Sequence, residues 1–238
     1  ISWQPTGSVV EGATTFLPSG NSLNFEGVGE SGRYVVLNKF VNSEGADFGS
    51  AVAIMGNVTS DANVDLWFQN GGGLLIGASA TFDVGSLLLT TQDTQLGGVF
   101  EYNGEGSGGQ TDSYIVHIRP SEGVSSNAAV DIRGRITVGS GGPSSSYFAV
   151  VAPRIAMSGT ADVAGSVAYV AAEAANITIS DNLFDIRVSE GTSVAEALTH
   201  SGSTLVATSA NNQNIYMVAI PKNNAVSMLV QGNLGFDA

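Results

Sequence analysis

The sequence contains no cysteine, which excludes disulfide bonds, thiol nucleophiles and zinc sites with cysteine ligands. Basic residues are scarce, because eight Lys and Arg stand against 21 Asp and Glu, for a formal net charge of -13. Nucleic-acid binding needs a basic surface, so no nucleic acid is expected as a partner. An acidic surface also disfavours anionic membranes, and it favours solubility and cation binding.

Long hydrophobic runs and helical heptads are missing as well. Glycine is abundant, with 31 of 238 residues, and it destabilises helix interiors while it favours turns. The segment "NVDLWFQNGGGLLIGASATFDVGSLLLTT" (63–91) combines short apolar runs with glycine breaks, and no run reaches transmembrane length. For "TSVAEALTH" (192–200) alone we expect one or two helical turns, with Thr192 or Ser193 as the cap.

Short strand-like segments recur along the whole chain. Each is rich in β-branched or aromatic residues and is bounded by Gly, Asn, Ser or Pro. The clearest are 35–40, 51–55, 64–68, 74–76, 80–84, 87–89, 114–118, 129–132, 136–138 and 147–151. The Asn-Gly turns typical of hairpins occur only at residues 70–71 and 103–104, so the spacing is not that of successive hairpins.

A degenerate unit also recurs: a small polar residue, Gly, any residue, a β-branched residue, then polar-apolar alternation. Copies are "MGNVTSDANVDL" (55–66), "RGRITVGSGG" (133–142), "SGTADVAGSVAYV" (158–170) and "QGNLGF" (231–236). Such repeats predict a solenoid. We therefore expect an all-β fold, a right-handed single-stranded parallel β-helix that forms one domain over residues 1–238, with small loops or hairpins outside the coils. A β-sandwich with the same number of strands is the alternative.

Residues 64–91 resemble the central signature of the filamentous-haemagglutinin-type secretion domain, the N-terminal domain of two-partner-secretion exoproteins. That signature contains an "NPNG" turn, an "ILFG"-like run and "VGGLVAST". Asn70 and Gly73 match the first and last residues of the turn, while Gly71 and Gly72 replace its Pro and Asn. Four other segments resemble family segments in the family's order: "ISWQ" (1–4), "SLNF" (22–25), "YVVLNKF" (34–40) and "SYFAVVAPRIAMSGTADVAGSVAYVAAE" (146–173).

The resemblance covers residues 1–173, and residues 174–238 resemble generic coils of large repeat-rich exoproteins of Gram-negative bacteria. It implies a right-handed parallel β-helix that is secreted or displayed on the cell surface, outside the outer membrane. Family members are mostly adhesins, and the domain engages an outer-membrane transporter during export. Glycans of a host or matrix are expected ligands. The missing Pro replaces a rigid turn by a permissive one, so a fused β-barrel or another export route is an alternative.

The two ends of the sequence also carry an expectation. The chain starts at the family's "I-x-W" strand and stops at "GNLGFDA", inside what resembles another coil. An open coil exposes unpaired backbone groups and apolar core. We therefore expect a segment of a larger secreted protein whose ends meet other protein, either copies of itself stacked head to tail or flanking chain. Caps that simply lie outside the sequence are the alternative.

Catalytic residues are not expected. The candidate acids stand singly at strand ends or in turns, where Asp bonds its own backbone; they are Asp61, Asp65, Asp83, Asp131, Asp162 and Asp185. His117 alternates with apolar residues, and His200, in a Ser/Thr/Gly segment, is expected to be solvated. The segment "GEGSGGQ" (104–110) lacks a P-loop Lys and predicts a loop that leaves the rod. The acidity is compatible with calcium, but the nonapeptide calcium repeat is absent, so we expect no cofactor.

Two pairs of neighbouring side chains have simple structural interpretations. Trp67 and Phe68 alternate on a strand, so we expect one in the core and the other under a flanking loop, in preference to a sugar-stacking pair. Asp185 and Arg187 share one face and predict an outward charge ladder. The sequence therefore favours a non-enzymatic secreted or cell-surface structural or adhesive protein, with a filament subunit as one form of it. A carbohydrate-active β-helix enzyme, a polysaccharide lyase or glycosidase, is the alternative.

Overall fold

The computed structural model describes residues 1–27, 34–94, 114–120, 127–140, 146–180, 183–207 and 213–236. Every regular element in this part of the chain is a β-strand, so the all-β prediction is confirmed. The segment 192–200 is not helical, contrary to expectation: it contains the strand β22 (Glu196–His200), because its apolar residues serve a sheet. No helix among the described residues has the length and hydropathy to span a membrane.

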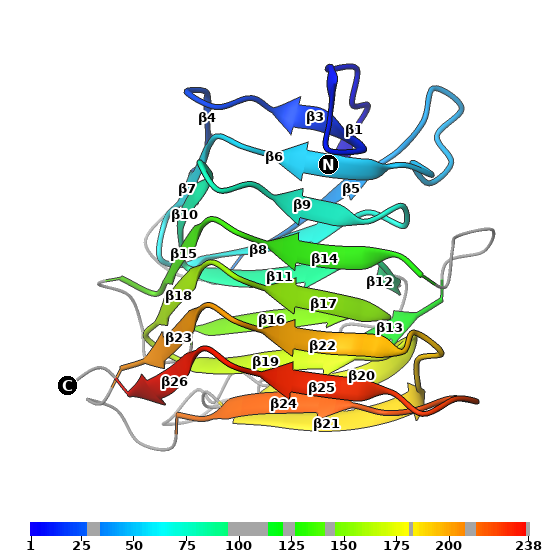
Figure 1. The fold of residues 1–238 in the computed structure, drawn as a ribbon. Helices are drawn as coiled ribbons and strands as arrows, with labels where there is room; N and C mark the ends of the chain where they lie inside the picture. Colours follow the sequence, from blue (N-terminus) through cyan, green and yellow to red (C-terminus); the bar gives the residue numbers. More distant parts are fainter. Residues whose placement is uncertain are drawn as a thin grey trace.

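Three sheets are built from parallel strands (Figure 1). Sheet 1 contains β1 (Ser2–Trp3), β5 (Tyr34–Phe40), β8 (Val64–Gln69), β11 (Ser86–Thr90), β16 (Tyr147–Ala152), β19 (Ser166–Ala171) and β24 (Ile215–Ala219). Sheet 2 contains β2 (Val9–Val10), β3 (Ala13–Leu17), β6 (Ala51–Ile54), β9 (Leu74–Ile76), β14 (Ala129–Ile132), β17 (Arg154–Met157), β22 and β25 (Ser227–Val230). Sheet 3 contains β4 (Ser22–Phe25), β7 (Asn57–Ser60), β10 (Thr81–Val84), β15 (Arg135–Val138), β18 (Thr160–Val163), β23 (Ser203–Val206) and β26 (Asn233–Phe236).

The chain visits these sheets in a constant rotation. From β3 it passes to β4 in sheet 3, then to β5 in sheet 1, and returns to sheet 2 with β6. The same order recurs down to β26, so each pass adds one strand to each sheet, and Figure 1 shows the passes as stacked layers. The strands are parallel with one exception, because β2 pairs with β3 in antiparallel orientation.

A fourth sheet is antiparallel and covers sheet 1. It contains β12 (Asp93–Thr94), β13 (Tyr114–Arg119), β20 (Ala174–Ser180) and β21 (Leu183–Glu190). It fits the expected hairpins outside the coils. The segment 104–110 lies outside the described residues, so the expectation of a loop there stays a prediction.

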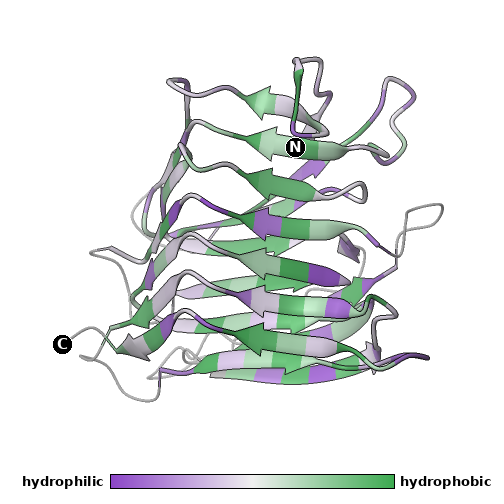
Figure 2. Cartoon of the chain, in the orientation of Figure 1, coloured by the Kyte–Doolittle hydropathy of each residue, from purple (hydrophilic) through white to green (hydrophobic). Residues whose placement is uncertain are grey.

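Apolar side chains fill two layers, and Figure 2 shows the apolar residues gathered along the strands. The main core lies among the three parallel sheets and contains Val150, Ile155 and Val163. The second layer lies between sheets 1 and 4 and contains Val170. Alternate residues of a strand point to opposite faces, so Val150 and Val151 of β16 serve different layers.

Both ends of the stack consist of edge strands. Among the described residues β1, β2 and β4 are the edge strands at the first end, and β24, β25 and β26 are those at the last end. Large apolar side chains are exposed on these last strands, such as Leu229, 49% exposed, and Phe236, 61% exposed. Head-to-tail stacking of copies stays a prediction.

The recurring polar-Gly pair forms the corner between sheets 2 and 3. At this corner the backbones of successive layers lie so close that no side chain fits. A Cβ at Gly159 would lie 2.1 Å from the carbonyl oxygen of Gly134, and one at Gly202 would lie 2.0 Å from that of Gly159. The same oxygens accept hydrogen bonds from Thr160 and Ser203 in the next layer. Gly232 continues this glycine column.

Gly159→Ala should therefore lower the free energy of unfolding by about 1–3 kcal/mol, the usual cost of overpacking a close contact. Gly49→Ala is the matched control, because a Cβ at Gly49 meets open space at an ordinary φ. Urea unfolding followed by circular dichroism measures both. Equal stability of the two variants would contradict the role of the corner.

Candidate functional site

The turn Asn70–Gly73, the expected secretion motif, connects β8 to β9. The Gly73 amide donates to the Asn70 carbonyl over 3.0 Å, which closes a tight turn. The Asn70 side chain closes it: Nδ2 donates to the Gly73 carbonyl at 2.6 Å and to the Ser50 carbonyl at 2.9 Å. The "NGGG" break between two apolar runs favours an external turn, and this expectation is wrong. Asn70 is only 1% exposed, and the turn is packed against the segment before β6.

Close packing explains the glycine that replaces the Asn of the "NPNG" turn. A Cβ at Gly72 would lie 2.3 Å from the Ser50 carbonyl oxygen, so no side chain fits there. Gly73 has φ 115°, in the region that side chains disfavour. Glycine at residues 72 and 73 is therefore a steric requirement of this layer.

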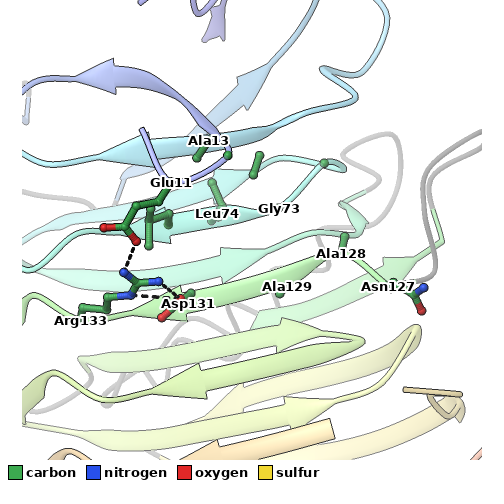
Figure 3. A pocket seen from close by; sticks show the side chains of 13 residues that line it. Glu11, Ala13, Gly73, Leu74, Asn127, Ala128, Ala129, Asp131 and Arg133 are labelled. Atoms are coloured by element: carbon green, nitrogen blue, oxygen red, sulfur yellow. Dashed lines mark hydrogen bonds and ion pairs between the residues drawn. The ribbon is translucent and has the colours of Figure 1, made fainter. Parts of the chain in front are cut away.

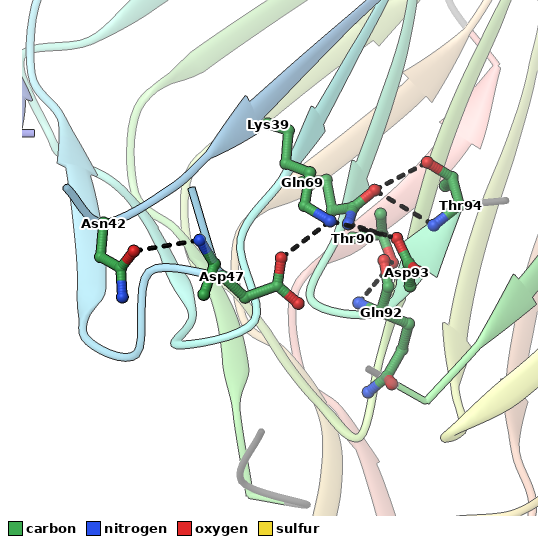
Figure 4. Close-up of polar contacts among 9 residues, drawn as sticks. Lys39, Asn42, Asp47, Gln69, Thr90, Gln92, Asp93 and Thr94 are labelled. Atoms are coloured by element: carbon green, nitrogen blue, oxygen red, sulfur yellow. Dashed lines mark hydrogen bonds and ion pairs between the residues drawn. The ribbon is translucent and has the colours of Figure 1, made fainter. Parts of the chain in front are cut away.

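A polar cluster lies beside the turn, where β8 and β11 end (Figure 4). The Gln69 side chain donates through Nε2 to Asp93 at 2.8 Å. Its Oε1 accepts from the backbone amide and the hydroxyl of Thr94 at 3.1 and 2.7 Å. The Lys39 ammonium lies 2.8 Å from Asp47 and 3.5 Å from Asp93. Partial burial alone would lower the pKa of Lys39, but the hydrogen bond and charge of Asp47, aided by Asp93, raise it above its usual value.

A hollow of about 290 Å³ lies on the other side of the turn, against sheet 2 (Figure 3). Gly72 and Gly73 contribute to its wall. At one end Arg133 forms ion pairs with Glu11 and, through Nη2 at 2.7 Å, with Asp131. The hydrogen bonds to Asp131 and Glu11 raise the pKa of Arg133 above its usual value. Glu11 belongs to the β2–β3 turn, so the pair crosses β6 and β9 to reach the chain after β14.

Each of the six candidate carboxylates has a structural partner. Asp61 accepts from the Gly27 amide at 2.9 Å, and Asp83 accepts from the Ser140 hydroxyl at 2.6 Å. The remaining contacts are Asp65 with Tyr147, Asp131 with Arg133, Asp162 with Arg135, and Asp185 with Arg187. The last pair is exposed on β21, so the predicted charge ladder is confirmed. Among the described residues no group of three His, Asp or Glu could hold a metal ion.

Trp67 and Phe68 divide between the two apolar layers, as predicted. Phe68 lies in the main core and Trp67 lies under sheet 4, which takes the place of the expected loop. The Trp67 indole donates to the Tyr147 hydroxyl at 2.7 Å, and that hydroxyl donates to Asp65 at 3.2 Å. This buried polar group was not predicted. Its sequence signal is weak, since the residues lie about 80 positions apart and meet only through the stacking of layers.

The two histidines occupy different environments. His117, on β13, lies with Nδ1 2.8 Å from the Asn176 amide oxygen. His200 is 1% exposed, so the prediction that it is solvated is wrong: β22 turns its side chain into the core beside Tyr169. Its Nε2 lies 2.8 Å from the Thr204 hydroxyl, and its Nδ1 has no hydrogen-bond partner. Burial lowers the pKa of His200.

Because the folded-state pKa of His200 is lowered, its contribution to stability is present above the unfolded pKa of about 6.5 and is lost as pH falls. The free energy of unfolding should fall below pH 6.5 by at most about 1.4 kcal/mol per pH unit from this group. His200→Gln should flatten this dependence between pH 7.5 and 5.5. An unchanged slope in His200→Gln would contradict the assignment.

No protein-family model matches the sequence, and no curated protein matches it closely enough to identify a relative.

Proposed function

We propose that the chain is a right-handed single-stranded parallel β-helix that serves as a non-enzymatic structural or adhesive protein, secreted or displayed on the cell surface, of the filamentous-haemagglutinin type. The observation that carries this proposal is the constant rotation of the chain through three parallel sheets, with the Asn70–Gly73 turn at a fixed corner of one layer. The rotation continues beyond residue 173 through β22 to β26, which supports a single domain. The hand follows from the crossover rule for parallel strands.

The roles of the carboxylates support a non-enzymatic function over a lyase or glycosidase. Glycosidases need two carboxyl groups that flank one bond, and their acid needs a raised pKa. The candidate Asp side chains instead bond a backbone amide, a hydroxyl or an adjacent Arg, which are structural uses. Asp83 and Asp162 share the outer row of sheet 3, two strands apart with Thr137 between them, and each is bonded to a different partner.

The surroundings of the turn support a role in export. Lys39, Asp47 and Asp93 present both signs of charge beside the turn, and Asn70 fixes its shape. A transporter that recognises this region meets a preformed surface, which lowers the entropy cost of binding. We assign Asn70, Gly71, Gly72 and Gly73 to the support of this surface, because the turn is packed inward and holds the neighbouring chain in place.

In the source bacterium, Asn70→Ala should lower the amount of exported protein, because the turn loses both hydrogen bonds of Asn70. The exported protein is measured as the amount that protease added outside the cells degrades. Asn42→Ala is the matched control: the Asn42 side chain also holds a turn, accepting from the amides of Glu44 and Ala46 at 2.9 and 3.0 Å, but outside the motif. Thermal unfolding of both purified variants separates lost recognition from lost folding. Export of Asn70→Ala at the parent level would contradict the role of the turn.

The purified protein should release no products from polysaccharides. Incubation with a panel of acidic and neutral polysaccharides, with unsaturated products and reducing ends measured over time, tests this directly. The variant Asp83→Asn, which changes a carboxylate bonded to Ser140, is assayed beside the parent protein. Reproducible turnover by the parent would establish the carbohydrate-active alternative.

A further inference from the structure

The hollow on sheet 2 exists because four adjacent strands carry small residues in register. Val52, Leu74 and Val130 lie side by side in the main core. Their preceding neighbours therefore face outward. These are Ala51, Gly73 and Ala129, and Ala13 pairs with Ala51 on β3. On the same outer face Leu75 packs with Ala13 and Ala53 in a small apolar cluster, so the floor is apolar.

The charged end of the hollow keeps hydrogen-bonding capacity. Arg133 has five N–H donors, and the structure uses three: Nε and Nη2 toward Asp131 and Nη1 toward Glu11. Two N–H groups therefore stay available. The second carboxylate oxygens of Asp131 and Glu11 are likewise unused in this pairing. The ion pair of Glu11 with Arg133 holds the β2–β3 turn over the sheet.

We propose that this hollow binds one pyranose ring of a neutral glycan. A pyranose presents an apolar C–H face and a rim of hydroxyl groups that both donate and accept hydrogen bonds. The apolar floor of Leu75 and the alanines matches the face. The free donors of Arg133 and free acceptors of Asp131 and Glu11 match neighbouring hydroxyls.

Charge selects a neutral sugar over an acidic one. Glu11, Asp131 and Arg133 together carry one net negative charge, and the whole chain carries -13. A uronate carboxylate at this end would meet Asp131 and Glu11 as well as Arg133, and the guanidinium already pairs with both. A neutral hydroxyl avoids that repulsion.

The biological role of this site rests on the proposed adhesive function: a neutral glycan would be the ligand of the adhesive protein. Binding itself is measured on the isolated protein and needs no export. A failed sugar site therefore leaves the export proposal standing, and failed export leaves the sugar site standing.

Saturation-transfer NMR with the methyl glycosides of glucose, galactose and mannose should show transfer to at least one of them. Ala51→Leu, which fills the floor, should raise its dissociation constant about tenfold or more. Asp131→Asn, which removes the negative charge of an acceptor, should also raise the dissociation constant. The controls are Ala156→Leu, on the same face of sheet 2 but outside the hollow, and Asp162→Asn, an ion-paired carboxylate on sheet 3.

The proposal stands if the parent and both controls bind one glycoside equally and the two hollow variants bind it more weakly. No transfer to any of the three glycosides would overturn it, as would equal weakening by Ala51→Leu and Ala156→Leu. Tighter binding of glucuronate than of the neutral glycosides would overturn the assignment to a neutral sugar. Thermal unfolding of each variant shows that the comparison is between folded proteins.

Discussion

The whole structure depends on the close contact of backbones at the corner between sheets 2 and 3. There the carbonyl oxygen of one glycine occupies the space that a side chain would need in the next layer. The same oxygen accepts the amide hydrogen bond that starts the next strand of sheet 3. The contact therefore fixes the spacing and the register of the layers together. Sheets 1 and 2 inherit that register because each pass of the chain is continuous between corners.

This spacing also determines what a layer can hold at its other corners. Gly72 lies almost as close to the Ser50 backbone as the glycines of the column lie to one another, so no side chain fits at residue 72. The Asn70–Gly73 turn contains no Pro, and its rigidity comes from the Asn70 amide, which bonds two carbonyl groups. Close backbone packing and one side chain thus fix the shape of this turn together.

The strands and the glycine corner could be predicted from the sequence, because both are local signals. Alternation along a strand reflects its two faces, and the polar-Gly pair repeats with each layer. His200 was misjudged, because neighbouring Ser and Thr predict a solvated segment while the layer above supplies Tyr169 and the layer itself supplies Thr204 as core partners. The Glu11–Arg133 pair spans 122 residues, and the Asp65–Tyr147 contact spans 82. Such contacts form because the layers stack, and a single sequence does not show which residues of different layers will meet.

The same stacking gives the three parallel sheets different outer faces, and this difference limits where a ligand can bind. The outer row of sheet 1, with Trp67, Leu88 and Ala149 in register, is covered by sheet 4. The outer row of sheet 3 carries Asn24, Thr59 and Asp83, polar side chains that bond one another or their neighbours and are solvated. Sheet 2 alone combines small residues, an apolar floor and a charged end that retains free hydrogen-bonding groups. The hollow on sheet 2 therefore lies on a face that is neither covered like sheet 1 nor uniformly polar like sheet 3. The β2–β3 turn, held by Arg133, closes one side of it.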